Sequence, residues 1–364
     1  MFRSFEEIEE FVLRNRRTRV RIALAAAQDE PALSALVEAQ RKGIARGVLI
    51  GKEGEIRSLL AEMGEKAEDY TLLDCPDEAA CAALATKLIH RGEADVMMKG
   101  ILPTATFVRA ILSHENGLVP PGGLISQAAV FPHEGRLVVF TDCAVNIAPD
   151  LAAKRRILEN VLPVTAALGM EQPKVAVLSA VENVSSKIVS TVDAAELERE
   201  TVGNCVIQGP LALDGAISRA HAEHKGITGP VAGQADVLLL PDLCSGNVLY
   251  KSITCIAGLP VASTICGASA PVVITSRADA PESKYLSILL SVLYVKLIGV
   301  KTPEEYHNKP SPPSTSSVRS APCRPTSTCS SSCRSCGTAS PRSSKTALPS
   351  CAPSAISSGW TSSS

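Results

Sequence analysis

The sequence predicts an α/β protein built on a doubly wound sheet. Over residues 19–91, short apolar runs of strand length alternate with segments whose apolar residues recur at helical spacing, and the connections are short. The chain has 364 residues, of which 45% are hydrophobic, so it can bury a large core and is more naturally two domains than one. These observations together indicate an enzyme-sized globular protein.

The elements of the first part follow from these patterns. The run RVRIALAA, from Arg19 to Ala26, has the apolar, β-branched composition of a buried strand. In order, we expect a helix over 6–17, a strand over 19–26, a helix over 31–42, a strand over 47–50, a helix over 53–63, a strand over 70–73 and a helix over 77–91. The sequence contains neither G-x-G-x-x-G after the first strand nor G-x-x-x-x-G-K-[ST], so the usual signatures of dinucleotide binding and P-loop chemistry are missing.

The second part continues the alternation. A turn at His133-Glu134-Gly135 predicts a hairpin whose second strand is Arg136 to Phe140, and a long helix is expected over 150–168. Further strand-like runs open the segments 173–190, 206–218 and 235–251.

A strand-to-helix turn near the end of the second part concentrates polar side chains. Pro271 to Thr275 has the length of a buried strand. Helical apolar spacing follows at Leu286, Leu289, Leu290, Leu293 and Leu297. Ser276, Arg277, Asp279 and Glu282 therefore lie where ligands collect in open α/β sheets, beyond the carboxyl end of a strand. Asp279 and Glu282 are also spaced as a capping box, which would only start the helix.

A second polar turn follows the expected strand that ends at Lys99-Gly100. Thr104 and Arg109 lie on the loop and helix that come next. A lysine, an open glycine backbone and an arginine fork suit a phosphoryl group. The alternative is a solvated lysine and a surface arginine on an ordinary turn.

Charge and cysteine content exclude several classes of protein. Of the 36 Lys and Arg residues, six lie in residues 306–364, where there is no Asp or Glu, so residues 1–305 carry 30 basic and 37 acidic residues and a net charge of −7. We therefore do not expect nucleic acid as a partner, because phosphate binding needs a basic face. No apolar stretch approaches the roughly 18 residues that span a bilayer, so we expect no membrane association and a cytoplasmic location. The seven cysteines of residues 1–305 have no metal-ligand spacing, and we expect no metal.

The composition changes abruptly near residue 309. Residues 301–364 are treated as a low-complexity, disordered tail, because Ser, Pro, Thr, Arg, Ala and Cys dominate it and it has little apolar periodicity. Cys329, Cys333 and Cys336 are irregularly spaced and have no histidine nearby, which argues against a metal site. One hypothesis is translation in a shifted reading frame; the alternative is a disordered partner-binding segment.

Four segments carry distinctive motifs: MKG at 98–100, TDCAVNIAP at 141–149, GNVLYK at 246–251 and SRADAPE at 276–282. Together they resemble the phosphate acetyl/butyryltransferase family. The resemblance covers about residues 15–300, and the first three motifs are closer to the butyryl-transferring members than to the acetyl-transferring ones. It implies a two-lobed αβα architecture with a central cleft, similar to isocitrate and isopropylmalate dehydrogenases.

The resemblance also implies how the chain divides. Residues 1–125 together with 266–300 would form one discontinuous lobe, and residues 126–265 the other. Family members are typically dimers, so a homodimer or higher homo-oligomer is expected.

The activity that the resemblance implies is acyl-CoA plus phosphate giving acyl phosphate plus CoA, without metal or cofactor and by direct thiolate attack. Ser276 resembles the serine that donates to the acyl carbonyl, and Arg277 the arginine that contacts CoA or phosphate. Arg109 resembles the arginine that holds the phosphoryl group, with Lys99, Gly100 and Thr104 beside it. Asp279 or Glu282 would take the thiol proton. Alternatives are a phosphate acetyltransferase, a non-catalytic CoA or acyl phosphate-binding protein, and a dehydrogenase of the same broad fold.

Three more residues are weaker candidates for substrate binding. Asp214, Asn247 and Lys251 follow expected strands of the second lobe and could line the cleft. Each could equally be a helix cap or a turn residue.

Overall fold

The computed structural model describes residues 1–15, 19–275 and 279–299, which all fall within one compact unit. Ser276, Arg277 and the tail predicted over 301–364 lie outside the described residues. The division into two lobes stays a prediction.

An eleven-stranded mixed sheet runs through the described chain. Its strand order is β3-β2-β1-β4-β11-β10-β5-β6-β9-β7-β8. The strands are β1 (Val20–Ala25), β2 (Ala45–Gly51), β3 (Thr71–Asp74), β4 (Val96–Lys99), β5 (Ser126–His133), β6 (Arg136–Thr141), β7 (Lys174–Leu178), β8 (Val206–Leu211), β9 (Val237–Leu239), β10 (Ala262–Cys266) and β11 (Val272–Val273). Strand 272–273 thus returns to pair with β4, although some 170 residues separate them in the chain.

Helices precede or connect these strands. They are α1 (Phe5–Arg14), α2 (Glu30–Arg41), α3 (Glu53–Glu62), α4 (Glu78–His90), α5 (Thr104–Ile111), α6 (Leu151–Ala167), α7 (Val189–Glu198), α8 (Leu213–Ile217), α9 (Arg219–His224), α10 (Leu243–Lys251) and α11 (Pro281–Ile298), with short 3-10 and π turns at Ala67–Asp69 and Ser252–Ile256. The expected alternation over residues 19–91 is confirmed, with element ends shifted by a few residues.

The direction of the strands changes in the middle of the sheet. β1 to β4 and β11 are parallel, and β6 to β9 are parallel to one another. Between these two sets, β10 is antiparallel to both β11 and β5, and β5 and β6 form the expected hairpin. The sheet is therefore mixed, where the sequence predicts a doubly wound sheet.

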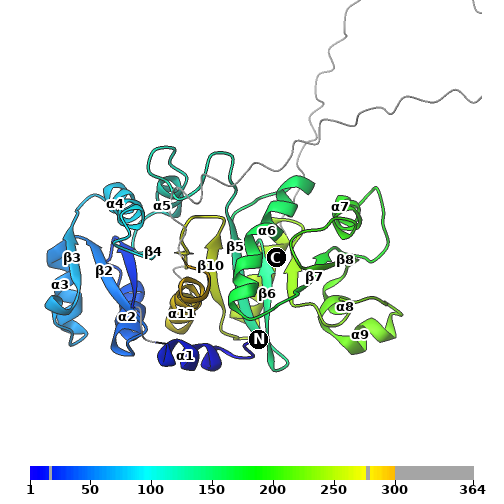
Figure 1. The fold of residues 1–364 in the computed structure, drawn as a ribbon, viewed down its shortest axis with the longest axis horizontal. Helices are drawn as coiled ribbons and strands as arrows, with labels where there is room; N and C mark the ends of the chain where they lie inside the picture. The colour runs from blue at the N-terminus through cyan, green and yellow to red at the C-terminus, as the bar shows by residue number, and fades with distance from the viewer. Residues whose placement is uncertain (16–18, 276–278, 300–364) are drawn as a thin grey trace, which may run out of the picture. The chain divides into compact units, whose positions relative to one another are not determined.

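Helices cover both faces of the sheet and make an αβα arrangement. Helices α1, α2, α3, α6, α7 and α11 pack into one apolar core, which lies on one face. Helices α4 and α5 form a second core on the other face, and α8 and α10 contribute to a third. In Figure 1, the gold helix α11 lies between the blue and the green strands, where it contacts α2, α6 and β10. This helix follows the turn that the sequence analysis singles out.

The strand before that turn is shorter than expected. It was predicted over 271–275 but comprises only Val272–Val273. The backbone leaves the sheet after Val273, and the carbonyl of Ile274 accepts instead from the side-chain amide of Gln127, at 3.5 Å. The polar turn therefore begins closer to the interior of the sheet than the sequence pattern indicates.

Candidate active site

The turn between β11 and α11 lies beside the end of β4. Because Val273 pairs in parallel with Met98, the chain leaving β11 passes next to Lys99 and Gly100. Two of the polar turns predicted from sequence therefore meet at neighbouring strands. Ser276 and Arg277 lie outside the described residues, so Asp279 is the first candidate of this turn whose surroundings are described.

Asp279 is held in a buried position by helix α10. Its side chain is only 3% exposed. One carboxylate oxygen, Oδ2, accepts a hydrogen bond of 3.1 Å from the Tyr250 hydroxyl, and the other, Oδ1, lies 3.9 Å from the Lys251 ammonium. Residues 250–251 and 279 belong to different predicted lobes, so this contact joins the two segments that the sequence analysis expects to face each other.

The capping interpretation of this turn is wrong. Helix α11 begins at Pro281 with Ala280 as its N-cap, and no described side chain caps it. Asp279 instead directs its carboxylate at α10. Glu282, the other candidate base, is exposed on the first turn of α11. The two carboxylates thus differ clearly in burial and in bonding.

Lys99 and Gly100 form a closely packed loop at the end of β4. The Lys99 ammonium is buried and donates to the carbonyl oxygens of Gly100 and Leu102, each at 3.0 Å. The alternative is therefore wrong for the lysine, although Arg109 is exposed, as that alternative expects. Glycine is required at position 100, because a Cβ there would clash with the carbonyl oxygen of Ala26. The loop is thus pinned to the end of β1, and one buried cation lies within it.

The loop after β6 is organised around the buried carboxylate of Asp142, which the sequence analysis did not select as a site residue. It accepts five hydrogen bonds of 2.6–3.3 Å from the backbone N–H groups of Gln127, Ala144, Val145 and Asn146 and from the side-chain amide of Asn146. A buried carboxylate this well satisfied fixes the backbone around it. The signal was present in TDCAVN, which was quoted only as a family motif.

Gln127 connects that loop to the candidate turn. Its side-chain oxygen accepts from the Cys143 thiol at 3.2 Å, and its nitrogen donates to the Ile274 carbonyl. Burial, together with the nearby Asp142 charge, raises the pKa of the Cys143 thiol well above its ordinary value. Cys143 is therefore protonated and unsuited to act as a nucleophile.

Lys284 is a further buried cation that sequence reasoning missed. It lies in the second turn of α11, and burial lowers the pKa of its ammonium, while the charges of Asp279 and Asp29 act in the opposite direction. Its position five residues after Asp279 is the only signal in the sequence, and such spacing is too common to be informative.

Other predicted residues lie elsewhere or lack contacts with this turn. The Asp214 carboxylate accepts from Lys225 Nζ at 2.9 Å, and this hydrogen bond lowers its pKa; Glu182 binds the same ammonium at 3.0 Å. The side chains of Thr104, Arg109 and Asn247 are exposed and make no hydrogen bond or ion pair with another described residue. Of the weaker candidates, only Lys251 is brought to Asp279.

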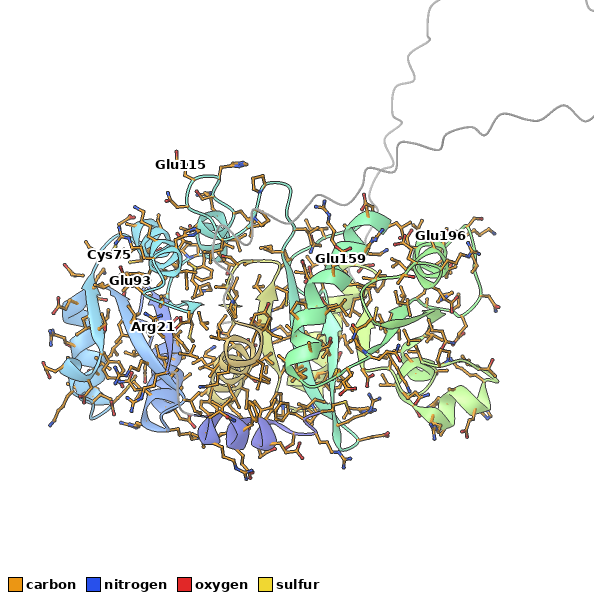
Figure 2. The ribbon with its side chains drawn as sticks, viewed as in Figure 1. Arg21, Cys75, Glu93, Glu115, Glu159 and Glu196 are labelled. Atoms are coloured by element: carbon orange, nitrogen blue, oxygen red, sulfur yellow. The ribbon has the colours of Figure 1, made fainter. Side chains whose placement is uncertain are left out.

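A cavity of about 470 Å³ lies near the amino end of β1 and the carboxyl end of α11. Arg21, labelled in Figure 2, lines it and makes a bidentate ion pair with Asp95, with bonds of 2.8 and 3.1 Å. None of the predicted site residues lines this cavity, which is at the opposite end of β1 from Lys99 and Gly100. Polar groups that converge on one place indicate a binding site better than cavity volume alone. We therefore keep the turn after β11 as the candidate site.

No group of three or more His, Cys, Asp or Glu side chains in the described part of the chain could hold a metal ion. No helix among the described residues is long and apolar enough to cross a bilayer.

The chain is an α/β protein whose candidate active site lies at the strand-to-helix turn after β11. The polar turn after β4 follows the neighbouring strand. The family model described as phosphate acetyl/butaryl transferase matches residues 77–292, and the chain belongs to that family. This match includes β4, the Asp142 loop, α10 and Asp279.

Similar proteins agree with this assignment. The chain is 42% identical over 299 residues to a phosphate butyryltransferase of Clostridium acetobutylicum, covering 80% of this chain and 98% of that one. It is 37% identical over 280 residues to a phosphate acetyltransferase of Thermotoga maritima, covering 75% and 95%. Its fold matches the crystal structure of a branched-chain phosphotransacylase from Enterococcus faecalis V583 with a TM-score of 0.68 and 34% identity, over 76% and 99% of the two chains.

Proposed function

We propose that this protein is a phosphate acyltransferase that interconverts acyl-CoA plus phosphate with acyl phosphate plus CoA. The observation that carries the proposal is the buried Asp279 carboxylate, which is bonded by Tyr250 and Lys251 and follows the strand that pairs with β4. Relatives at 37–42% identity named phosphate acetyltransferase and phosphate butyryltransferase support the same reaction. CoA is a substrate in this scheme, and no cofactor is needed.

Asp279 is the general base in the proposed mechanism. In the direction of acyl-CoA synthesis, it takes the proton from the CoA thiol, and the resulting thiolate attacks the acyl carbonyl of acyl phosphate. The carbonyl–phosphate C–O bond then breaks and phosphate leaves. The reverse reaction follows the same steps backwards. We favour Asp279 over Glu282, because its side chain is buried and oriented whereas Glu282 is exposed.

Donors and cations complete the proposed chemistry. Ser276 donates to the carbonyl oxygen as negative charge develops on it, and Arg277 and Arg109 bind the phosphoryl group or CoA. Lys99 adds a positive charge that is already buried, so it needs no further removal from water. Gly100, Thr104, Asp214, Asn247 and Lys251 are proposed to contact substrate around these groups. Burial raises the pKa of the Cys143 thiol and disfavours its thiolate form, which supports direct attack over an acyl-enzyme on that residue.

We propose a cleft between two lobes, similar to that of isocitrate dehydrogenase, as the place where these substrates meet. A homodimer or higher homo-oligomer and a cytoplasmic location remain proposals from sequence. The substrates are small molecules, and no nucleic acid or membrane is needed for this reaction.

The acyl group is proposed to be short, with butyryl preferred. Greater identity to the Clostridium acetobutylicum butyryltransferase than to the Thermotoga maritima acetyltransferase supports this preference. Phosphate-dependent release of CoA thiol should be measured with acetyl-, propionyl- and butyryl-CoA. Release should require phosphate, and kcat/KM should be highest for butyryl-CoA. A maximum with acetyl-CoA would identify an acetyltransferase, and saturable CoA binding without release would identify a non-catalytic binding protein.

Arg109→Ala is expected to raise the KM for phosphate by about tenfold or more and to change the KM for acyl-CoA by less than about twofold. The reason is that a charge-assisted contact to the phosphoryl group is lost, while the thioester side of the site is unchanged. Arg109 is exposed and bonded to no other described side chain, so folding should be unaffected. Initial rates with each substrate varied in turn give both constants.

Arg57→Ala is a matched control, because Arg57 is also an exposed helical arginine and, among the described residues, forms ion pairs with Glu53 and Glu68 alone. Equal changes in the two KM values for Arg109→Ala, or an effect no larger than that of Arg57→Ala, would contradict the phosphate assignment.

A further inference from the structure

We propose that Tyr250 is a positioning residue that orients the Asp279 carboxylate for proton transfer. The inference rests on the proposed function, in which Asp279 is the base. It assigns to helix α10 a part in the reaction through a residue that the sequence analysis did not select.

The contacts of Asp279 are divided between its two oxygens. Tyr250 donates to Oδ2 at 3.1 Å, whereas Lys251 faces Oδ1 at 3.9 Å. Two adjacent residues of α10 therefore contact different oxygens of the Asp279 carboxylate, which lies on another segment of the chain. The tyrosine supplies the shorter and more directional contact, so it fixes the rotation of the carboxylate about its last bond. Because Oδ2 carries the Tyr250 hydrogen bond, we assign Oδ1 as the oxygen that accepts the proton.

Tyr250 is itself held in a fixed position. It is only 7% exposed, and its ring lies against Phe140 of β6 with ring centres 6.2 Å apart and planes inclined at 55°. A buried aromatic side chain with this packing has little rotational freedom. The hydroxyl that bonds Asp279 is therefore held by a side chain with little freedom to rotate, as a positioning group requires.

Helix α10 is fixed in turn at its amino end. The Asp242 carboxylate caps the helix by accepting from the backbone of Ser245 at 2.8 Å. Gly246 packs directly on the backbone of Asp142 and Cys143, where a Cβ would clash. Because Asp142 is the centre of the five-bond network described above, the rigidity of that loop extends through α10 to Tyr250.

Four described titratable groups face Asp279 from three elements. Tyr250 and Lys251 come from α10, Cys143 from the loop after β6, and Lys284 from α11. Burial and the charge of Asp279 raise the pKa of Tyr250 above its ordinary value, and the Cys143 pKa is raised as well. Both groups are therefore neutral at working pH. Among the described neighbours, Tyr250 is the neutral oxygen donor to this carboxylate.

The test compares two tyrosines that each donate to a carboxylate. Tyr250→Phe removes the hydroxyl from Asp279. Tyr70→Phe removes the hydroxyl of an equally buried tyrosine, which donates to Glu65 at 2.7 Å, next to β3 and remote from the turn. Tyr250→Phe should lower kcat by about 10- to 100-fold, the effect expected for one hydrogen bond to a charged group, with the KM for CoA changed less than about twofold. Tyr70→Phe should leave kcat unchanged.

The pH dependence of kcat is a measurement that a purely structural role of Tyr250 would leave unchanged. The ionised carboxylate loses a stabilising donor in Tyr250→Phe, so the acid limb of the kcat profile should move to higher pH. In Tyr70→Phe this limb should stay in place. Melting temperatures of the two variants should fall by similar amounts, because each loses one hydroxyl from a packed ring.

A double variant separates action through Asp279 from an independent role. Tyr250→Phe combined with Asp279→Asn should be no slower than Asp279→Asn alone, because nothing remains to be positioned. A further loss equal to that of Tyr250→Phe by itself would overturn the proposal, as would an unchanged kcat and acid limb in the single variant. A wild-type protein that forms no acyl phosphate would instead overturn the proposed function, which is a distinguishable result.

Discussion

Asp279→Asn is expected to lower kcat by about two to four powers of ten, the range for loss of a positioned general base. The amide cannot accept the thiol proton, but it has nearly the same shape and can still accept the Tyr250 hydrogen bond through its oxygen. The acid limb of the kcat profile should disappear, because the group that titrates there is gone. Steady-state rates between about pH 3.5 and 9 measure both effects, a span that includes the ordinary titration range of carboxyl and imidazole groups.

Folding must be preserved for this result to be interpreted. The ion pair with Lys251 is lost, but at 3.9 Å it is long and the lysine is 39% exposed, so the loss of this pair alone should lower the unfolding free energy by about 1 kcal/mol or less. Thermal or urea unfolding of both proteins measures it. Glu282→Gln is the competing variant. If Glu282→Gln is slow and loses the acid limb while Asp279→Asn is near normal, the base is Glu282.

Ser276→Ala is expected to lower kcat by roughly one to three powers of ten with little change in the KM for CoA. This is the range for removal of one donor to a developing oxyanion. Ser276 lies outside the described residues, so its role is assigned from the family resemblance and from its place between Val273 and Asp279. Single-turnover rates at saturating CoA and acyl phosphate separate the chemical step from binding.

Ser287→Ala is the matched control for that variant. Ser287 is a buried serine of α11 whose hydroxyl accepts from the Ser263 N–H at 2.9 Å. Its removal should cost about 1–3 kcal/mol of stability, because a buried donor loses its partner, and should leave the chemical step unchanged. A near-normal chemical rate for Ser276→Ala, with Ser287→Ala behaving as expected, would show that the carbonyl is not polarised at this turn.

Periodicity predicts most of the first part of the fold well. The helix expected over 31–42 is α2 (Glu30–Arg41), and the strand expected over 47–50 lies within β2 (Ala45–Gly51). Their patterns are local and are not altered by long-range contacts. The antiparallel middle of the sheet could not be predicted in this way. Strand β5 is apolar along most of its length because both of its faces are covered, so its sequence carries no information about the direction of its neighbours.

The candidate site could be predicted only in part, because several of its contacts join residues that are far apart in the chain. Asp279 and Lys99 were selected because they follow expected strands. Gln127 was missed because its partner Ile274 is 147 residues away, and Tyr250 because its hydroxyl is directed at Asp279 by the packing of its ring on Phe140. The spacing of these residues in the chain indicates none of these contacts. The capping interpretation failed because it considered only the helix that follows Asp279.

The most direct test of the account is to measure acyl phosphate and free CoA together in wild-type protein and Asp279→Asn. With butyryl-CoA and phosphate, the wild type should form the two products in equal amounts and only when phosphate is present. Asp279→Asn should remain folded and form both more slowly by the same factor. Release of CoA without acyl phosphate, or equal rates in the two proteins, would contradict the claim that this chain transfers acyl groups to phosphate at the Asp279 turn.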